Sequence, residues 1–262
     1  MPTSEVLTGD AFARTWAELT RHLDGAWVRR TAGAVVSVTG LPVAAFNSVA
    51  VWSPGAAAGG IDGHVAELAG GGVPFSLTAP VEAADRYGSV AARHGLTVAG
   101  DVPLMVLADA AAVVEPPVPG LSVRRLAPGE IDQHARLAGP ALGLPPVVFE
   151  SLTSPAMAGA GPSSFYVGEV DGRPVTTGLG VTLGPSVAVL NVATAAAHRG
   201  RGYGAAVSAR VVRDGAAAGA GWAWLQSSRA GLGVYRSLGF EVVQVRRCWV
   251  SAAVPASARP GR

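Results

Sequence analysis

The heptapeptide His198-Arg-Gly-Arg-Gly-Tyr-Gly204 stands between an apolar run, Val187–Thr194, and a segment of residues 202–218 with helical character. The order predicts a strand, a glycine-rich turn and a helix. Glycines let the backbone approach a ligand closely, and a helix N-terminus directs N–H groups and positive potential at an anion. We therefore expect a cradle for a pyrophosphate, to which Arg199 and Arg201 add charge. The spacing differs from the Gly-x-Gly-x-x-Gly pattern of dinucleotide-binding folds, and an ordinary glycine-rich turn is the alternative.

A second informative segment is Gln226-Ser-Ser-Arg-Ala-Gly-Leu-Gly-Val-Tyr-Arg-Ser-Leu-Gly-Phe240. We expect a strand to end near its start and a short helix, Leu232–Leu238, to carry Tyr235. A phenol that a short helix holds beside a cofactor thiol can donate a proton to a leaving thiolate. The alternative is that Tyr235 packs in the fold with a satisfied hydroxyl.

The sequence contains 20 arginines and no lysine. This excludes Schiff-base lysine chemistry, standard P-loop nucleotide hydrolases and protein kinases. Any bound anion must be held by arginine, by backbone N–H groups or by helix N-termini. The bias toward arginine, alanine and glycine is typical of a GC-rich bacterial genome. With 49% hydrophobic and 15% charged residues, the chain can bury a core and is not expected to be disordered.

Charge is unevenly distributed along the chain. Residues 1–115 hold 6 Arg and 11 acidic residues, a net charge of −5, and residues 116–262 hold 14 Arg and 7 acidic residues, a net charge of +7. The basic half suggests a polyanionic ligand, although a solvated surface is the alternative. Clusters of aromatic and basic residues are missing, so we expect no nucleic acid partner.

The proline-rich stretch Glu115-Pro-Pro-Val-Pro-Gly120 lies where the acidic and basic halves meet. Prolines at this density cannot continue a helix or a central strand. We therefore expect domains at residues 1–115 and 121–250, a linker at 116–120 and a flexible tail at 251–262.

Hydrophobic periodicity predicts alternating helices and strands in both halves. In the first half we expect helices at 12–19, 59–68 and 81–94 and strands at 34–39, 48–52, 74–78 and 102–107. In the second half we expect helices at 128–138, 145–152, 202–218 and 232–238 and strands at 121–126, 164–170, 175–183, 187–194, 222–226 and 240–250.

These features together resemble the GNAT acyltransferase superfamily. Asn191-Val-Ala-Thr194 followed by Arg199-Gly-Arg-Gly-Tyr-Gly204 is similar to its acetyl-CoA motif, and Val234-Tyr235-Arg-Ser-Leu-Gly-Phe240 is similar to its C-terminal tyrosine motif. The resemblance implies an α/β fold with a mixed, mostly antiparallel central sheet flanked by helices. It also implies acetyl-CoA as the cosubstrate and an amine, either a small molecule or a peptide, as the acceptor.

The resemblance also implies roles for individual residues. The backbone of Val192, Ala193 and Thr194 would bind the pantetheine arm, and Tyr235 would be the general acid. Many family members have Asn where this chain has Ser228, and Asn191 would contact substrate where the central strands diverge. The residues that would hold the pyrophosphate are Arg199, Gly200, Arg201, Gly202, Tyr203, Gly204 and Ala205.

The first half resembles the degenerate first domain of bacterial two-domain GNAT proteins. The resemblance rests on Leu41-Pro-Val-Ala-Ala-Phe-Asn-Ser-Val49, Gly72-Val-Pro-Phe-Ser-Leu-Thr-Ala-Pro80, His94-Gly-Leu96 and Val102-Pro-Leu-Met105. No Arg-x-x-Gly-x-Gly motif occurs in this half. We therefore expect a tandem arrangement of two GNAT-like domains with one acyl-CoA site, in the second domain.

Other chemistry-bearing residues complete the prediction. Glu169 is a candidate general base and Glu150 a weaker one, with a plain surface role as the alternative for both. His22, His64, His94 and His134 lack ligand spacing, so we expect no metal. His198 is expected to flank the glycine-rich turn without a chemical role, and Cys248 in an apolar strand is expected to be packed. No signal peptide or membrane segment is apparent, and we expect a cytoplasmic monomer or homodimer. Two other functions stay open: a non-catalytic acyl-CoA-binding protein, and a CoA-dependent O-acyltransferase or thioesterase.

Overall fold

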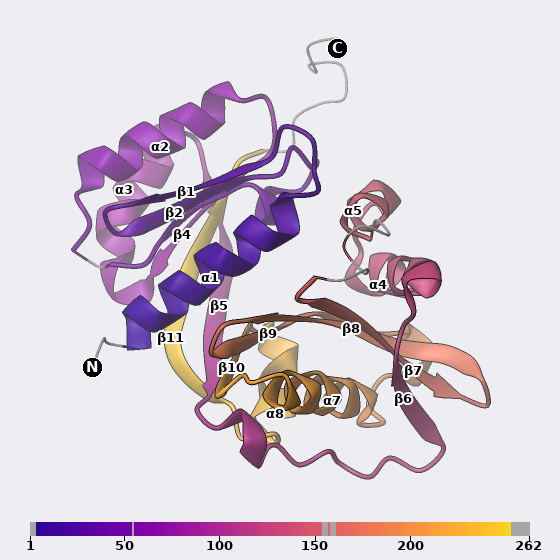
Figure 1. Ribbon diagram of the computed structural model, residues 1–262. Helices are drawn as coiled ribbons and strands as arrows, with labels where there is room; N and C mark the ends of the chain where they lie inside the picture. The colour runs from indigo at the N-terminus through magenta and orange to yellow at the C-terminus, as the bar shows by residue number, and fades with distance from the viewer. Residues whose placement is uncertain (1–3, 54, 154–156, 158–160, 253–262) are drawn as a thin grey trace. The chain divides into compact units, whose positions relative to one another are not determined.

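The computed structural model describes residues 4–53, 55–153, 157 and 161–252. The chain forms two compact units (Figure 1). Unit 1 consists of Met1–Val102 together with Gln244–Arg262, and unit 2 consists of Pro103–Val243. Strands β5 and β11 each contribute residues to both units, because each crosses a unit boundary.

Unit 1 is a sheet with helices on its faces. Its strands are ordered β1-β2-β3-β4-β11, with β3 and β4 parallel and the other neighbours antiparallel. A core of aliphatic side chains, including Val49, Ile61 and Leu77, joins α2 and α3 to the sheet. Its elements are α1 (Ser4–Thr20), β1 (Trp27–Thr31), β2 (Ala34–Val38), β3 (Ser48–Val51), α2 (Ala58–Gly70), β4 (Ser76–Pro80), α3 (Ala84–Arg93), the first part of β5 (Thr97–Leu107) and the last part of β11 (Glu241–Val250).

Asn47 is the polar centre of unit 1. Its Oδ1 accepts hydrogen bonds from the backbone N–H groups of Thr39 (2.9 Å) and Gly40 (3.1 Å), and its Nδ2 donates to the carbonyls of Leu41 and Pro74, both at 2.8 Å. The side chain is fully buried, so these bonds compensate its lost hydration. Asn47 thereby fixes the loop between β2 and β3.

Unit 2 has the strand order β5-β10-β9-β8-β7-β6, antiparallel except for the parallel pair β9 and β10. Helices α7 and α8 cover one face of this sheet and α4 covers the other, with α5 packed against α4 (Figure 1). Its further elements are β6 (Leu121–Arg125), α4 (Asp132–Leu142), α5 (Pro146–Leu152), β7 (Ser163–Val170), β8 (Arg173–Leu183), β9 (Ser186–Thr194), α7 (Tyr203–Ala217), β10 (Trp222–Gln226) and α8 (Leu232–Arg236).

Glycines allow α7 to lie very close to the sheet. A Cβ on Gly178 or Gly180 of β8 would lie 2.8 or 2.7 Å from valine side chains of α7. A Cβ on Gly215 of α7 would lie 2.7 Å from the Cβ of Val187. Because real Cβ atoms do not approach so closely, the absence of a side chain at these positions sets the distance between α7 and the sheet.

The fold class predicted from the sequence is confirmed, since mixed, mostly antiparallel sheets carry helices on both faces. The described helices and strands follow the predicted order. Strand β1 was not predicted, because its sequence, Trp-Val-Arg-Arg-Thr, alternates weakly and is partly exposed. Among the described residues, no helix combines the length and the apolar character that crossing a bilayer requires.

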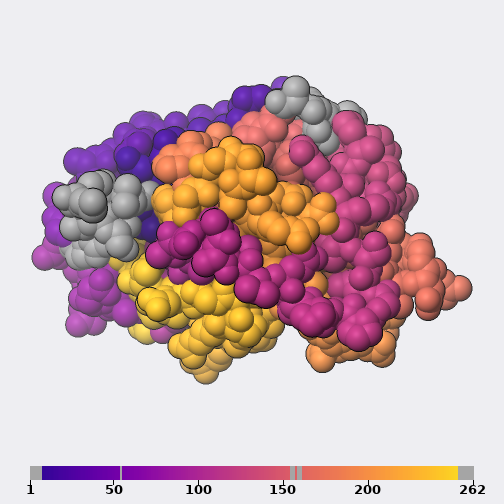
Figure 2. Space-filling model, turned by 60° about the horizontal axis from the view of Figure 1, so that its bottom comes forward, coloured from indigo at the N-terminus to yellow at the C-terminus, as the bar shows by residue number. Residues whose placement is uncertain are grey.

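The expected linker, residues 116–120, lies inside unit 2 and not at the boundary between the units. Strand β5 pairs with β10 in unit 2, and the chain after it contacts α7. The Ala110 N–H donates to the carbonyl of Gly221 (3.0 Å), and Glu115 forms an ion pair with Arg213 (2.7 Å). Figure 2 shows this magenta segment at the surface beside the orange residues around α7. The prolines interrupt strand pairing, but the segment packs within unit 2.

The end of the predicted second domain also lies elsewhere. Residues 246–250 of β11 pair with β4 of unit 1, in the register Trp249↔Leu77. The Ser251 N–H continues this contact by donating to the carbonyl of Phe75 (2.9 Å). Most of the expected flexible tail at 251–262, namely residues 253–262, lies outside the described residues. Strand pairing, rather than composition, therefore assigns the C-terminal strand.

Candidate functional site

A bulge in β9 marks the centre of the candidate site. The register between β8 and β9 shifts between Thr177↔Ala193 and Leu179↔Leu190. Asn191 in this interval has a φ of 49°, which is rare for a residue other than glycine. Bulges of this kind redirect the strand and are frequent at functional sites. The structure thus places Asn191 where the sequence suggested divergence of the strands.

The parallel ladder between β9 and β10 opens just before this bulge. It runs from Trp222↔Ser186 to Trp224↔Ala188, whereas β9 continues to Thr194 and β10 to Gln226. In the described part of the chain, the edge of β9 beyond Ala188 therefore has no ladder partner on the β10 side. Backbone groups of this edge can accept or donate hydrogen bonds to an extended ligand, as an added strand would.

The glycine-rich turn follows this open edge directly. Gly200 and Gly202 have φ values of 75° and 80°, a conformation that side chains disfavour. Gly202 precedes the first residue of α7, and the first N–H groups of a helix have no partner within it. Gly204 brings no side chain to the first turn, where a Cβ would meet Val192 at 3.7 Å. The turn and the first turn of α7 together can bind an anion through backbone N–H groups.

The two arginines of the turn have different environments. The Arg199 guanidinium donates to the carbonyls of Thr194 (3.2 Å) and Ala141 (2.8 Å), and so ties the end of β9 to the end of α4. Arg201 is exposed and forms no side-chain hydrogen bond with the residues that the structure describes. Arg199 thus braces the turn, and Arg201 is the arginine that can turn to a ligand.

Tyr235 lies in α8, with its ring centroid 6.0 Å from that of Phe240 and nearly perpendicular to it. Burial raises the pKa of the phenol by more than the nearby Ser208 hydroxyl lowers it. Ser208 itself donates to the carbonyl of Gly204 (2.8 Å), in the first turn of α7. Tyr235 is therefore a largely buried phenol beside Ser208, and Ser208 is bonded to the first turn of α7.

Ser228 has a structural role. Its hydroxyl accepts a hydrogen bond from the N–H of Gly231 (3.2 Å) and caps the turn that leads into α8. The side chain is exposed. A cofactor contact of Ser228, which the sequence suggested, stays a prediction.

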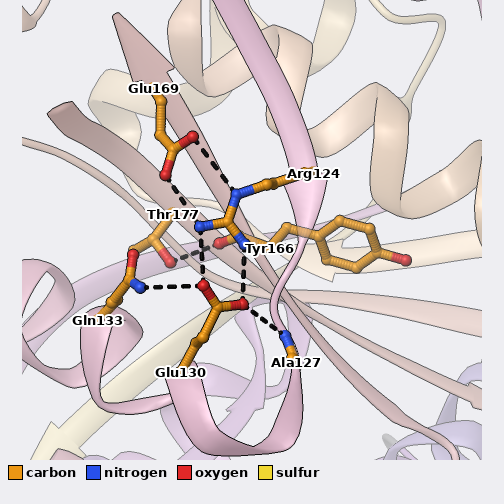
Figure 3. Close-up of polar contacts among 7 residues, drawn as sticks. All are labelled: Arg124, Ala127, Glu130, Gln133, Tyr166, Glu169 and Thr177. Atoms are coloured by element: carbon orange, nitrogen blue, oxygen red, sulfur yellow. Dashed lines mark hydrogen bonds and ion pairs between the residues drawn. The ribbon is translucent and has the colours of Figure 1, made fainter. Parts of the chain in front are cut away.

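Glu169 belongs to an ion-pair network on the α4 face of the sheet (Figure 3). Arg124 binds the Glu169 carboxylate at 3.0 and 3.3 Å and the Glu130 carboxylate at 2.8 and 3.0 Å. The pKa of Glu130 is lowered, first by Arg124 and then by the backbone N–H of Ala127. Glu169 lies at the hairpin end of β7, and β8 separates it from the bulge in β9. The network gives this carboxylate a structural task and leaves the general base unassigned.

The network borders a surface cavity of about 470 Å³. Gln133, Arg136 and Leu137 of α4 line it together with Glu169 and the β7–β8 hairpin. Arg136 is paired with Asp132 one helical turn earlier (2.8 Å). The charged side chains that line the cavity are thus already paired within the protein. The cavity therefore presents little unpaired charge to which an anion or a cation could bind.

His134 is a buried residue that the sequence did not single out. Its Nδ1 lies 2.7 Å from the Thr177 hydroxyl, which in turn donates to the carbonyl of Tyr166 (2.7 Å). Since that hydroxyl proton is used, the imidazole donates from Nδ1, and Nε2 has no hydrogen-bond partner. Burial lowers the pKa of His134 to about 3. Among the described residues, no group of three or more His, Cys, Asp or Glu side chains is arranged to hold a metal.

Two parts of the site were not predicted from the sequence: Ser208 and the bulge geometry at Asn191. Ser208 lies one helical turn after Gly204 on α7, so helical spacing could have placed the two together. No sequence signal indicated that Tyr235 would contact Ser208, because that contact depends on the packing of α8 against α7.

The architecture and the site define a class of protein in which an open strand edge leads into a glycine-rich helix N-terminus. A protein from Kribbella flavida described as a GCN5-related N-acetyltransferase has the same fold, with a TM-score of 0.71, 21% identity and 96% of both chains covered. A GCN5-related N-acetyltransferase from Sphaerobacter thermophilus has a TM-score of 0.64 and 18% identity, over 94% of this chain and 86% of the other. A tandem GNAT protein from the clavulanic acid biosynthesis pathway has a TM-score of 0.55 and 16% identity, over 94% of this chain and 96% of the other.

A family model also matches part of the sequence. Residues 161–242 match the family model described as an acetyltransferase (GNAT) domain. The matched segment includes β9, the glycine-rich turn, α7 and Tyr235. No curated protein matches the chain.

Proposed function

We propose that the protein is an acyltransferase that moves an acetyl group from acetyl-CoA to an amine, with its one acyl-CoA site in unit 2. The observation that carries the proposal is the opening of the β9–β10 ladder directly before an anion-binding helix N-terminus. An extended pantetheine arm would pair with the edge of β9 at Val192 and Thr194. The pyrophosphate would then reach the turn from Gly200 to Gly204.

The chemistry needs an acid for the leaving group, and we assign this role to Tyr235. The amine nitrogen forms a bond to the thioester carbon, the C–S bond breaks, and the phenol gives its proton to the departing sulfur. The proton that the nitrogen loses passes to water, and the phenolate takes up a proton from water before the next turnover. A backbone N–H of β9 would stabilise the negative charge on the carbonyl oxygen. The raised pKa of Tyr235 keeps its proton in place at neutral pH until the thiolate develops.

The acid role is tested by Tyr235→Phe, with acetyl-CoA and a panel of amines and with thiol release as the readout. We expect turnover to fall by roughly 100-fold or more, while calorimetry shows unchanged CoA affinity. Tyr87→Phe is the matched control, because it removes a buried hydroxyl that bonds the carbonyl of Ala56 in unit 1 (2.9 Å). Equal turnover of Tyr235→Phe and the wild type with the best acceptor would reject this role.

The same assay separates the other functions. Thiol release without any amine indicates a thioesterase, and release that depends on alcohols indicates O-acyl transfer. Tight CoA binding without release by any acceptor indicates a binding protein. We propose a small-molecule or peptide amine as the acceptor. Only thiol release that depends on an added amine would support this acceptor class.

A further inference from the structure

Unit 1 repeats the arrangement that forms the candidate site in unit 2. In both units, two antiparallel neighbours precede a strand that leads into a helix and then into a parallel strand: β3–α2–β4 in unit 1 and β9–α7–β10 in unit 2. The parallel ladder of unit 1 runs from Ser48↔Ser76 to Ala50↔Thr78. The carbonyl of Val51 and the backbone beyond Thr78 thus lie where the ladder ends.

Arg246 of β11 fills this ladder end. One of its Nη atoms donates to the carbonyl of Val51 (2.7 Å) and lies 3.3 Å from both the carbonyl and the hydroxyl oxygen of Thr78. The other Nη donates to the Gln244 side chain (2.6 Å). The guanidinium carbon lies 4.2 Å from the ring centroid of Trp52. The residue is fully buried, with 0% exposure.

The side chain therefore bridges the two parallel strands of unit 1 at their carboxyl ends. A planar guanidinium with several donors in fixed directions suits this task, and an aromatic face compensates part of its lost hydration. The backbone oxygens that an extended ligand would need already have donors. The segment that follows β3, residues 52–60, also contains no arginine, so an anion there would have no counterpart of Arg201.

We propose that Arg246 is an internal substitute for a ligand, which closes the ladder end of unit 1 so that this unit takes up no acyl-CoA. The chain then binds one CoA, in unit 2, and unit 1 has its C-terminal strand fixed in place by the same side chain. The statement about CoA rests on the proposed function; the statement that Arg246 joins β3 to β4 does not.

Native mass spectrometry and hydrogen exchange of the full chain with CoA test the first statement. We expect one CoA per chain and slower exchange at 189–206, with unchanged exchange at 48–60. Two CoA molecules per chain, or protection at 48–60, would overturn the inference. No CoA at all would instead reject the proposed function and leave the role of Arg246 to the next experiment.

Arg246→Met tests the second statement, because methionine is unbranched and apolar and cannot bridge carbonyls. We expect exchange of β3 and β4 amides to become at least about tenfold faster, with α7 exchange and CoA affinity unchanged. The control is Arg247→Met, whose guanidinium is partly exposed and pairs with Asp101 (2.6 Å). If Arg246→Met does not fold, Arg246→Lys is compared with the control instead. Lysine keeps the positive charge but lacks the planar guanidinium with its several donors. Exchange of β3 and β4 equal to that of the control would refute the bridge.

Discussion

Arg199 and Arg201 are separated by one glycine, yet only Arg199 has its guanidinium engaged with carbonyls of the protein. The sequence motif treats the two arginines as equivalent sources of charge. The structure separates them, because the positive φ of Gly200 lets the chain turn between them. Which arginine faces a ligand therefore depends on backbone geometry that the composition of the motif does not contain.

The first prediction concerns Arg201→Ala. A charged hydrogen bond to a phosphate contributes about 1.5–3 kcal/mol, so we expect CoA to bind roughly 10- to 150-fold more weakly, as measured by calorimetry. Arg173→Ala is the control, since Arg173 is exposed on the β7–β8 hairpin and its loss changes net charge equally. If the two variants lose the same affinity, the effect is one of general charge and not of contact.

The second prediction concerns acid stability. His134 has a pKa of about 3 in the folded protein because it is buried, against 6.5 for the free side chain. Between pH 6.5 and pH 3, His134 therefore binds a proton in the unfolded chain but not in the folded protein. The contribution of neutral His134 to the free energy of unfolding is complete above pH 6.5 and decreases as the pH drops toward 3. The loss amounts to about 3 kcal/mol between pH 7 and pH 4.

Denaturant unfolding of wild type and His134→Gln across this range measures the effect. We expect the variant to be less stable at pH 7, because it loses the ring contacts with Phe149 and Phe165. Its stability should nevertheless depend less on pH. Parallel pH profiles for the two proteins would contradict the assignment of this titration to His134.

At the scale of elements, hydrophobic periodicity predicted most of the helices and strands, because the same apolar faces form the two cores. The bulge in β9 was not predictable, since it arises from the register against β8. The short distance between α7 and the sheet was also not predictable from the sequence. In the sequence, a glycine within a helix indicates only a low helix propensity. In the structure, Gly215 is instead a packing position.

The third prediction compares Gly215→Ala in α7 with Gly63→Ala in α2. Both changes raise helix propensity by about 1 kcal/mol. At Gly63 a Cβ meets nothing within 4 Å, so we expect a small gain in stability. At Gly215 the Cβ would lie 2.7 Å from Val187, so we expect a loss of about 1–3 kcal/mol through overpacking. Thermal unfolding measures both, and a gain at Gly215 would show that α7 can move away from β9 without cost.

At the scale of the whole molecule, the sequence predicted two domains with a linker at 116–120, and the compact units of the structure divide the chain differently. Charge and proline content change at 115–120, whereas the compact units change at 102–103 and again at 243–244. The reason is that long-range strand pairing assigns β5 and β11, and such pairing leaves no local mark in the sequence. The C-terminal strand is the clearest case, since it follows unit 2 in the chain and pairs with β4 of unit 1.

The last prediction concerns two fragments of the chain. Residues 103–243 keep the ladder from Ala223↔Leu107 to Gln226↔Leu104, which covers the outer edge of β10. Residues 121–250, the domain expected from the sequence, lack that strand and leave β10 as a bare edge. They also carry Trp249 without its partner strand β4. We expect the fragment 103–243 to unfold cooperatively and to bind CoA, and the fragment 121–250 to aggregate or to unfold at least about 5 °C lower. Circular dichroism measures the thermal stability of both fragments, and calorimetry measures their CoA affinity. If the fragment 121–250 equals the fragment 103–243 in both, the domain boundary lies at the prolines, as the sequence predicted.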